Sequence, residues 1–293
     1  MFITIKDDSV SATVDTLGAQ LISFQGRTGK EYIWQRDPAY WTSCSPLLFP
    51  AVGNSRNGKT LFDGISYDMP KHGVCRSEEF EVVSQSVNEV TLRLSANEAT
   101  RIHYPYDFVL TLTYQLEDGR LQITYQVANP QDSELLYCIG AHPGFLCPME
   151  DGAVFEDYQL EFEQVEDTTA MPYDLAAMQF DAAGNGLRLE HTSVLPLSYD
   201  LFDQDAVYFE QILSRRVSLI HKESRKGIEV SYPDFESVAF WTMSDKKAPF
   251  LCIEPWNGSA IRSDEDDEFA HKHQLQRLGA WESKVYLLEL RVL

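Results

Sequence analysis

The clearest pattern along the chain is an alternation of apolar and polar residues between Phe108 and Val127. A period of two is expected for a half-buried β-strand. The alternation is interrupted once, at Asp118-Gly119, and Asp-Gly is a strong signal for a tight hairpin turn because both central residues need positive φ. Closing a two-residue turn there puts apolar side chains opposite each other on one face: Leu116 with Leu121, and Tyr114 with Ile123.

Similar strand patterns recur along the chain, at Ser9–Thr16, Glu89–Ser95, Val217–His221, Gly227–Tyr232 and Lys284–Val292. Strands spaced through a chain with few helical stretches are typical of antiparallel sandwiches. The sequence therefore predicts an all-β fold, a large antiparallel β-sandwich. No linker, internal repeat or low-complexity tract divides residues 1–293, so we expect a single domain. One helix is predicted near Phe269–Leu278, and the acidic run Asp264–Glu268 is expected to be a solvated loop.

Composition and charge limit the classes of partner. The net charge is −21, from 45 acidic and 24 basic residues. Such a surface repels phosphate backbones and anionic lipids, so neither nucleic acid nor a membrane is an expected partner. No apolar run approaches the ~20 residues of a membrane span, and charge stands near the N-terminus where a signal peptide would be apolar. The five cysteines are scattered along the chain: Cys44, Cys75, Cys138, Cys147 and Cys252. Their spacing fits neither a metal site nor a disulfide framework, which predicts reduced thiols in a cytoplasmic protein.

Three short segments each place one imidazole or carboxylate among glycine or proline residues, which favour tight turns. The side chains are His72, His142 and Glu254, and the segments are Met69–Gly73, Gly140–Phe145 and Cys252–Gly258. Glu254 ends an apolar run, so burial should raise the pKa of its carboxyl group. A raised pKa suits a general base that works near neutral pH.

Other chemistries have less support in the sequence. Metal sites built from histidine and carboxylate ligands usually show a compact pair of ligands, whereas the candidates His72, His142, Asp205 and Glu254 are dispersed, so no metal is expected. Glycoside hydrolysis needs two carboxylates that flank the scissile bond, and only Glu254 has a suitable context. No glycine-rich phosphate-binding loop is present, so nucleotide binding is not predicted.

Together the three segments resemble the aldose 1-epimerase (galactose mutarotase) superfamily, most closely its LacX-like branch, and the resemblance runs nearly end to end. It implies a galactose mutarotase-like supersandwich. In that family a His-Pro-(Gly/Ala)-Phe turn carries the general acid, a role that the resemblance gives to His142. The general base stands in a Cys-(Ile/Val)-Glu-Pro-Trp segment, which gives that role to Glu254. The family's His-Gly step after Met-Pro binds the sugar beside its ring oxygen and corresponds to His72.

The resemblance assigns two further positions to substrate binding. The segment Leu48–Arg56 resembles one whose arginine contacts the sugar, which makes Arg56 the candidate, although the family often has Gly-Arg where this chain has Gly53-Asn54. The segment from Phe202 to Val207 resembles one whose aspartate binds sugar hydroxyls. The register favours Asp205, with Asp203 as the alternative.

Trp256 follows the candidate base after one proline. Its indole could offer an apolar platform to the C–H face of a sugar, or pack in the core. The family usually continues with Gly-x-Ala-Asp, whereas this chain reads Gly258-Ser259-Ala260-Ile261-Arg262. This departure affects the expected outer wall of the pocket and leaves the assignment of the base unchanged.

The resemblance implies a mutarotase that interconverts the α and β anomers of a hexose by acid–base ring opening and closing, without cofactor or metal. The expected partner is a small aldose. A hexose 6-phosphate is the alternative, because four cations fall in segments expected to border the pocket: Arg56, Lys59, Lys71 and Arg76. A non-catalytic carbohydrate-binding protein on the same fold is a further alternative. The free edges of a sandwich also allow a homodimer.

Overall fold

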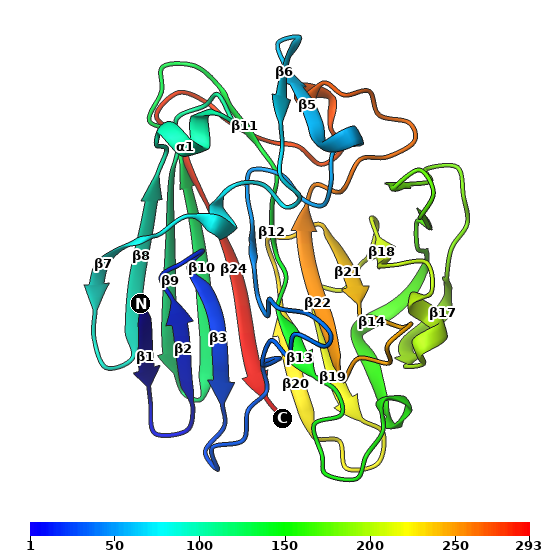
Figure 1. The fold of residues 1–293 in the computed structure, drawn as a ribbon. Helices are drawn as coiled ribbons and strands as arrows, with labels where there is room; N and C mark the ends of the chain where they lie inside the picture. The colour runs from blue at the N-terminus through cyan, green and yellow to red at the C-terminus, as the bar shows by residue number, and fades with distance from the viewer.

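The computed structural model describes residues 1–293 and is built almost entirely from β-strands (Figure 1). Its one α-helix, α1, spans four residues, Glu98–Arg101. The largest sheet has nine strands in the order β17-β14-β19-β20-β24-β10-β9-β8-β7. Their bounds are β7 Glu81–Gln85, β8 Glu89–Ser95, β9 Val109–Glu117, β10 Arg120–Ala128, β14 Tyr158–Thr169, β17 Arg188–Pro196, β19 Arg216–His221, β20 Gly227–Ser231 and β24 Ser283–Val292.

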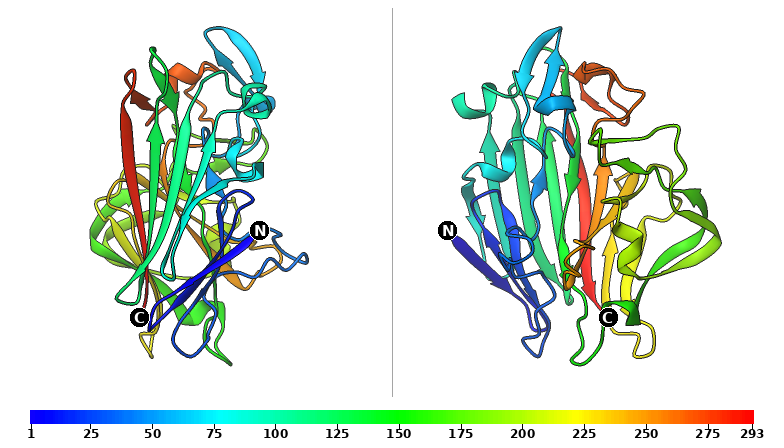
Figure 2. Two further views of the ribbon diagram at one scale, coloured as in Figure 1. Left: turned by 90° about the vertical axis from the view of Figure 1, so that its left-hand side faces the viewer. Right: turned by 45° about the vertical axis from the view of Figure 1, so that its right-hand side comes forward.

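Two smaller sheets lie on one face of the nine-stranded sheet, and the N-terminal one crosses it at an angle (Figure 2). The N-terminal sheet contains β1 Phe2–Lys6, β2 Ser11–Asp15 and β3 Gln20–Gln25. The other has the order β18-β21-β22-β12-β4, and β13 also pairs with β22. Its strands are β4 Leu47–Leu48, β12 Ile139–Ala141, β13 Gly144–Leu146, β18 Val207–Phe209, β21 Ser237–Trp241 and β22 Phe250–Asn257.

Three two-stranded ribbons complete the fold. They are β5 Lys59–Phe62 with β6 Ile65–Asp68, β11 Leu135–Tyr137 with β23 Gln276–Leu278, and β15 Tyr173–Asp174 with β16 Gln179–Phe180. A hydrophobic cluster of 79 buried residues runs through the layers. One continuous core is what a single domain requires, and a single cooperative unfolding transition stays a prediction. None of the helices could span a lipid bilayer, being too short and insufficiently apolar.

The predicted hairpin is confirmed in its register. Strands β9 and β10 pair antiparallel, with Leu116 opposite Leu121 and Tyr114 opposite Ile123. Buried and half-buried residues alternate along β9, because one face of the nine-stranded sheet packs on the core and the other faces solvent. The other predicted strands are also present, as β2, β8, β19, β20 and β24.

The predicted helix near Phe269–Leu278 is wrong. The chain makes one short 3-10 helix at Phe269–His271 and then extends into β23. In β23 the side chains of Gln276 and Leu278 are buried and Arg277 between them is exposed. Because β23 pairs with β11, this tertiary contact decides the local structure in place of the loose helical spacing of apolar residues. All five cysteines are buried and free of disulfides, as expected.

The acidic run Asp264–Glu268 is only partly solvated. Asp264 and Asp266 are exposed, but Glu265 is buried, and its carboxylate accepts a hydrogen bond from Lys272 Nζ at 3.1 Å. The expectation of a solvated loop is therefore wrong at Glu265, where a matched cation from the following segment makes burial of the charge tolerable.

Candidate active site

The candidate catalytic residues meet around strand β22, which is buried along its whole length. Cys252, Glu254 and Trp256 alternate along β22 and therefore share one of its faces. His142 lies in the turn between β12 and β13, and both of these strands pair with β22. Gly140 pairs with Trp256, and a Cβ at Gly140 would lie 2.6 Å from the indole Cδ1, so this glycine provides the space for the tryptophan.

His72 reaches the same place from a separate loop. Its backbone N–H donates to Gly53 O at 2.7 Å, and its side-chain Nδ1 accepts from Gly53 N–H at 3.1 Å. Burial, together with the nearby His142, Lys71 and Arg76, lowers the pKa of His72 well below its usual value. The ring is therefore neutral with its proton on Nε2, because Nδ1 is already an acceptor. His72 thus offers one N–H donor beside His142, whose ring centroid lies 5.4 Å away.

His142 and Glu254 form a directly contacting pair. His142 Nε2 lies 3.1 Å from Glu254 Oε2, and the two residues are 7% and 2% exposed. Burial lowers the pKa of His142 to about 3. Burial raises the pKa of Glu254 well above its usual value; Lys71 opposes this shift and Asp205 adds to it. Desolvation thus favours a state in which the pair holds one proton and carries no net charge.

Aromatic rings fix the position of His142. Trp41 stacks on its imidazole at 5.0 Å between centroids and 29° between planes, and Trp241 meets it edge-on at 5.9 Å. Neither tryptophan was identified from the sequence. The available signal was a tryptophan within the polar stretch Trp41-Thr42-Ser43, because an aromatic residue outside a strand pattern often serves a binding site.

These side chains border a cavity of about 270 Å³. That volume is slightly below the usual range of small-molecule pockets, so it suits a ligand of about one ring. The lining combines catalytic candidates, aromatic walls and two cations: Trp41, Pro46, Gly53, Asn54, Lys71, His72, Arg76, His142, Tyr173, Phe180, Asp205, Ala206, Trp241, Glu254, Trp256 and Ala260.

Of the two candidate aspartates, the structure brings Asp205 to the cavity and leaves Asp203 exposed outside it. Asp205 has a φ of +70°, a conformation that aspartate tolerates better than most residues. Burial and the Asp205 charge raise the pKa of Tyr173, which also lines the cavity, to about 12. Trp256 lines the cavity too, with Tyr208 packed against its indole at 5.3 Å.

Arg56 does not reach the cavity. Its Nε donates to Asp267 Oδ1 at 3.0 Å and its Nη1 to Gln179 Oε1 at 2.7 Å. The hydrogen-bond donors of the guanidinium are therefore used within the protein. Asn54, two residues earlier, lines the cavity instead. Asn54 stands where the family often has Gly-Arg, so the side chain next to Gly53 is the one that faces inward.

The four clustered cations divide into two pairs. Arg56 and Lys59 form ion pairs with Asp267 and Asp68. Lys71 and Arg76 line the cavity and form no ion pair with any acidic residue of the chain. In a chain of net charge −21, two cations without acidic partners beside one cavity favour an electron-rich ligand.

Cys252 adds a third polar atom to the catalytic candidates. Its Sγ and ligand atoms of His142 and Glu254 all lie within 4.8 Å of one another. Thiol, imidazole and carboxylate are ligand types that zinc accepts. Burial raises the pKa of the Cys252 thiol, so the sulfur stays protonated when no metal is bound. The absence of a metal requirement stays a prediction.

The family model of aldose 1-epimerase matches residues 1–276. Protein LacX (chromosomal) of Lactococcus lactis subsp. lactis is 33% identical over 287 residues, which cover 95% of both chains. The chain belongs to the aldose 1-epimerase family, and its LacX relatives support the LacX-like branch.

Solved structures agree with this assignment. A galactose mutarotase related enzyme from Lactobacillus acidophilus is 28% identical, with a TM-score of 0.94 over 100% of this chain and 97% of that one. A galactose mutarotase-like protein from Lactobacillus casei ATCC 334 is 26% identical, with a TM-score of 0.93 over the full length of both chains. The predicted galactose mutarotase-like β-sandwich is therefore confirmed.

Proposed function

We propose that this protein is an aldose 1-epimerase that interconverts the α and β anomers of a free hexose. The contact of 3.1 Å between His142 Nε2 and Glu254 Oε2 carries the proposal. The O1 hydroxyl and the ring oxygen of a sugar are bonded to the same carbon. An acid and a base that serve these two oxygens must therefore lie side by side, as these two side chains do.

In the proposed mechanism the shared proton first passes from Glu254 to His142 Nε2 across their contact. The ionised Glu254 then takes the proton from the C1 hydroxyl while His142 Nε2 gives its proton to the ring oxygen. The bond from C1 to the ring oxygen breaks and C1 becomes an aldehyde. After rotation about C1–C2, the former ring hydroxyl attacks the other face of the aldehyde. It returns its proton to His142 Nε2, and Glu254 returns a proton to O1. The pair thus begins and ends each cycle with one proton.

The remaining polar groups of the cavity would orient the sugar. The Nε2–H of His72 can donate to an oxygen beside His142, and the Asp205 carboxylate can accept from hydroxyl groups. Trp256 and Trp41 supply apolar surface, which suits the C–H face of a sugar ring. These assignments are supported by the cavity lining.

The test of the function is polarimetry on freshly dissolved α-glucose and α-galactose. We expect the protein to accelerate relaxation to the anomeric equilibrium well above the buffer rate. Calorimetry of sugar binding distinguishes the alternative. If the protein binds a hexose but accelerates no free or phosphorylated aldose, it is a carbohydrate-binding protein on the same fold.

The pair should give an unusually broad pH–rate profile. A second proton would remove the base, and loss of the shared proton would remove the acid. Because burial lowers the pKa of His142 to about 3, we expect kcat/KM to stay near its plateau at pH 4.5 and to fall only below it. With ordinary pKa values, about 4.3 for the glutamate and about 6.5 for the histidine, the second proton would add to Glu254 near pH 4.3 and would remove roughly half of the activity there. An acid limb centred near pH 4.3 or above would contradict this prediction.

A hexose 6-phosphate is the second candidate substrate, favoured by the unpaired cations Lys71 and Arg76. Both can make charge-assisted hydrogen bonds to phosphate oxygens. We expect glucose to react at least as fast as glucose 6-phosphate, because the Asp205 carboxylate in the same cavity opposes a phosphate. A preference for the phosphate that weakens at high salt and is lost in Arg76→Gln would instead support the second candidate.

A further inference from the structure

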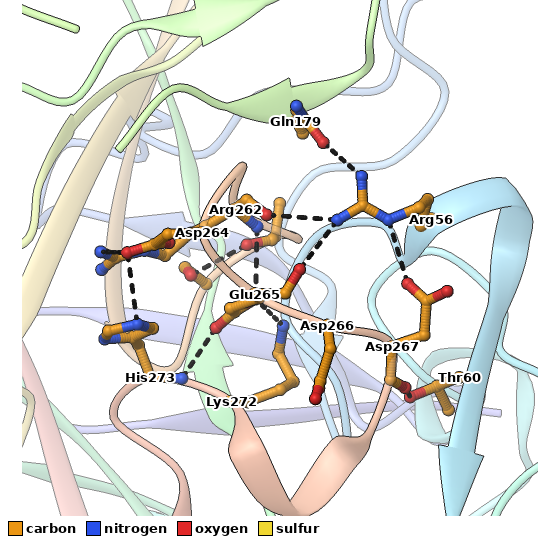
Figure 3. A network of polar contacts seen from close by, with 12 residues as sticks. Arg56, Thr60, Gln179, Arg262, Asp264, Glu265, Asp266, Asp267, Lys272 and His273 are labelled. Carbon is orange, nitrogen blue, oxygen red and sulfur yellow. Dashed lines mark hydrogen bonds and ion pairs between the residues drawn. The ribbon is translucent and has the colours of Figure 1, made fainter. Parts of the chain in front are cut away.

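Arg56 joins two segments that lie more than a hundred residues further along the chain (Figure 3). Its Nη1 donates to Gln179 Oε1 at 2.7 Å, on strand β16. Its Nη2 donates to the backbone oxygens of Arg262 and Glu265 at 3.4 and 3.0 Å, and its Nε to Asp267 at 3.0 Å. We call this set of contacts the Arg56 clamp. It fixes the β15–β16 hairpin and the loop Gly258–Glu268 to one guanidinium.

The two clamped segments form one wall of the cavity, here called the outer wall, with Tyr173, Phe180 and Ala260. They are also joined to each other, because Phe180 N–H donates to Ile261 O at 3.0 Å and Ser263 N–H donates to Phe180 O at 2.8 Å.

The hairpin has few other attachments. Apart from a bridge between Phe180 and Arg262, strands β15 and β16 pair with each other and belong to none of the larger sheets. Asn54 adds one tie on the cavity side, since its Nδ2 donates to Met178 O at 2.7 Å and its Oδ1 accepts from Tyr173 OH at 3.1 Å. Tyr173 and Phe180 are therefore held by these polar contacts and by the packing of Phe180, which is 1% exposed, on Tyr208 at 4.7 Å between ring centroids, rather than by a large sheet.

Ion pairs that each include at least one buried residue hold the other side of the clamp. Arg262 is 6% exposed and pairs with Glu210 and with Asp264, the latter at 2.8 Å. Glu265 accepts from Lys272 Nζ at 3.1 Å and from His273 N–H at 2.8 Å (Figure 3). Removing one partner from such a network leaves an uncompensated charge, so the loop is held in one arrangement.

We propose that Arg56 is a positioning residue that holds the outer wall in place and thereby restricts the cavity to monosaccharides over reducing disaccharides. The inference rests on the proposed function for its substrate class. The cavity of about 270 Å³ leaves little room beyond one ring, and a wall held by directional hydrogen bonds cannot recede to admit a second. Arg56 acts through Tyr173 and Phe180 without touching the sugar.

The kinetic test measures Arg56→Gln, Gln179→Ala and the double variant that combines these two changes. Lys59→Gln serves as the control. Lys59 is a matched control because it carries an exposed ion pair in the neighbouring strand β5. Loss of the clamp should raise KM for glucose roughly 5–20-fold and leave kcat within about twofold of the wild-type value. It should also lower the ratio of kcat/KM for glucose to kcat/KM for maltose. Gln179→Ala should do the same to a smaller extent, and the double variant should be no worse than Arg56→Gln.

Hydrogen exchange tests the clamp independently of any activity. Amides of residues 173–181 and 258–265 should exchange at least about tenfold faster in Arg56→Gln than in the wild type or Lys59→Gln. Unchanged exchange would overturn the clamp, as would faster exchange with unaltered KM and sugar preference. An effect of Arg56→Gln on KM with none from Gln179→Ala would mean that Arg56 contacts the sugar directly. If the wild type turned over no sugar while exchange still responded, the clamp would stand as a structural device, and the proposed function and the substrate selection would fall.

Discussion

Replacing Glu254 by Gln is expected to slow mutarotation by about 10²–10⁴-fold, the usual contribution of one acid–base partner. The amide keeps the shape of the side chain and can still contact His142, but it cannot accept the proton of the C1 hydroxyl. His142→Asn should lose a similar factor, because it removes the proton donor to the ring oxygen. Since both side chains act on one pair of proton transfers, the double variant should be little worse than either single one.

Glu166→Gln is the matched control for this experiment. Glu166 is also a buried carboxylate, at 1% exposed, but it accepts hydrogen bonds from Leu213 and Ser214 N–H and does not line the cavity. Its rate should equal that of the wild type in polarimetry corrected for buffer catalysis. If Glu254→Gln or His142→Asn kept most of the wild-type rate, the acid–base assignment would be wrong.

The native Glu254 side chain is expected to lower the stability of the folded protein, and Glu254→Gln should show this. The folded-state pKa of Glu254 is raised by burial, so the native state binds more protons than the unfolded chain above the ordinary glutamate pKa. Stability contributed by this group therefore falls as pH rises through that range. Glu254→Gln should remove this penalty, as is common for residues selected for activity rather than stability.

Local pattern was sufficient to predict the all-β class, strand β2 and six strands of the nine-stranded sheet, β8, β9, β10, β19, β20 and β24. The β9–β10 hairpin was predictable to the residue because its Asp118-Gly119 turn and its apolar alternation specify the same register. Residues 269–278 were not, because the burial of Gln276 and Leu278 depends on pairing with β11, which lies more than a hundred residues earlier in the chain. Glu265 shows the same limit, since its burial depends on Lys272 and on the backbone of His273.

The candidate site follows a similar division. His72, His142 and Glu254 could be identified because each stands in a short motif whose glycine and proline residues serve the local backbone. The structure brings all three together, with Asp205 and Trp256. Arg56 could not be placed correctly, because its partners Gln179 and Asp267 come from distant segments. The Trp41 stack on His142 was missed for the same reason, since no local pattern links these residues.

Gly73→Ala is expected to be strongly destabilising. Gly73 has a φ of +78°, and a Cβ there would lie 2.2 Å from Phe49 O and 2.4 Å from Phe49 C. Both atoms are backbone, and Phe49 is fully buried, so relief requires the main chain to move. We expect a loss of roughly 3–5 kcal/mol. In a chain of this size that should lower Tm by roughly 5–8 °C.

Gly64→Ala separates the clash from the backbone strain. Gly64 has nearly the same φ, +75°, but no atom lies within 4 Å of the position of its Cβ. It should therefore lose only the strain of positive φ, about 1–2 kcal/mol, and keep full activity. Gly73→Ala should in addition lose activity while folded, because His72 is the preceding residue and its backbone oxygen accepts from Phe49 N–H. Urea or thermal unfolding of both variants, with polarimetry below their transitions, measures the difference. Equal losses of stability in the two variants would show that Phe49 moves freely and that the His72 loop is not held against it.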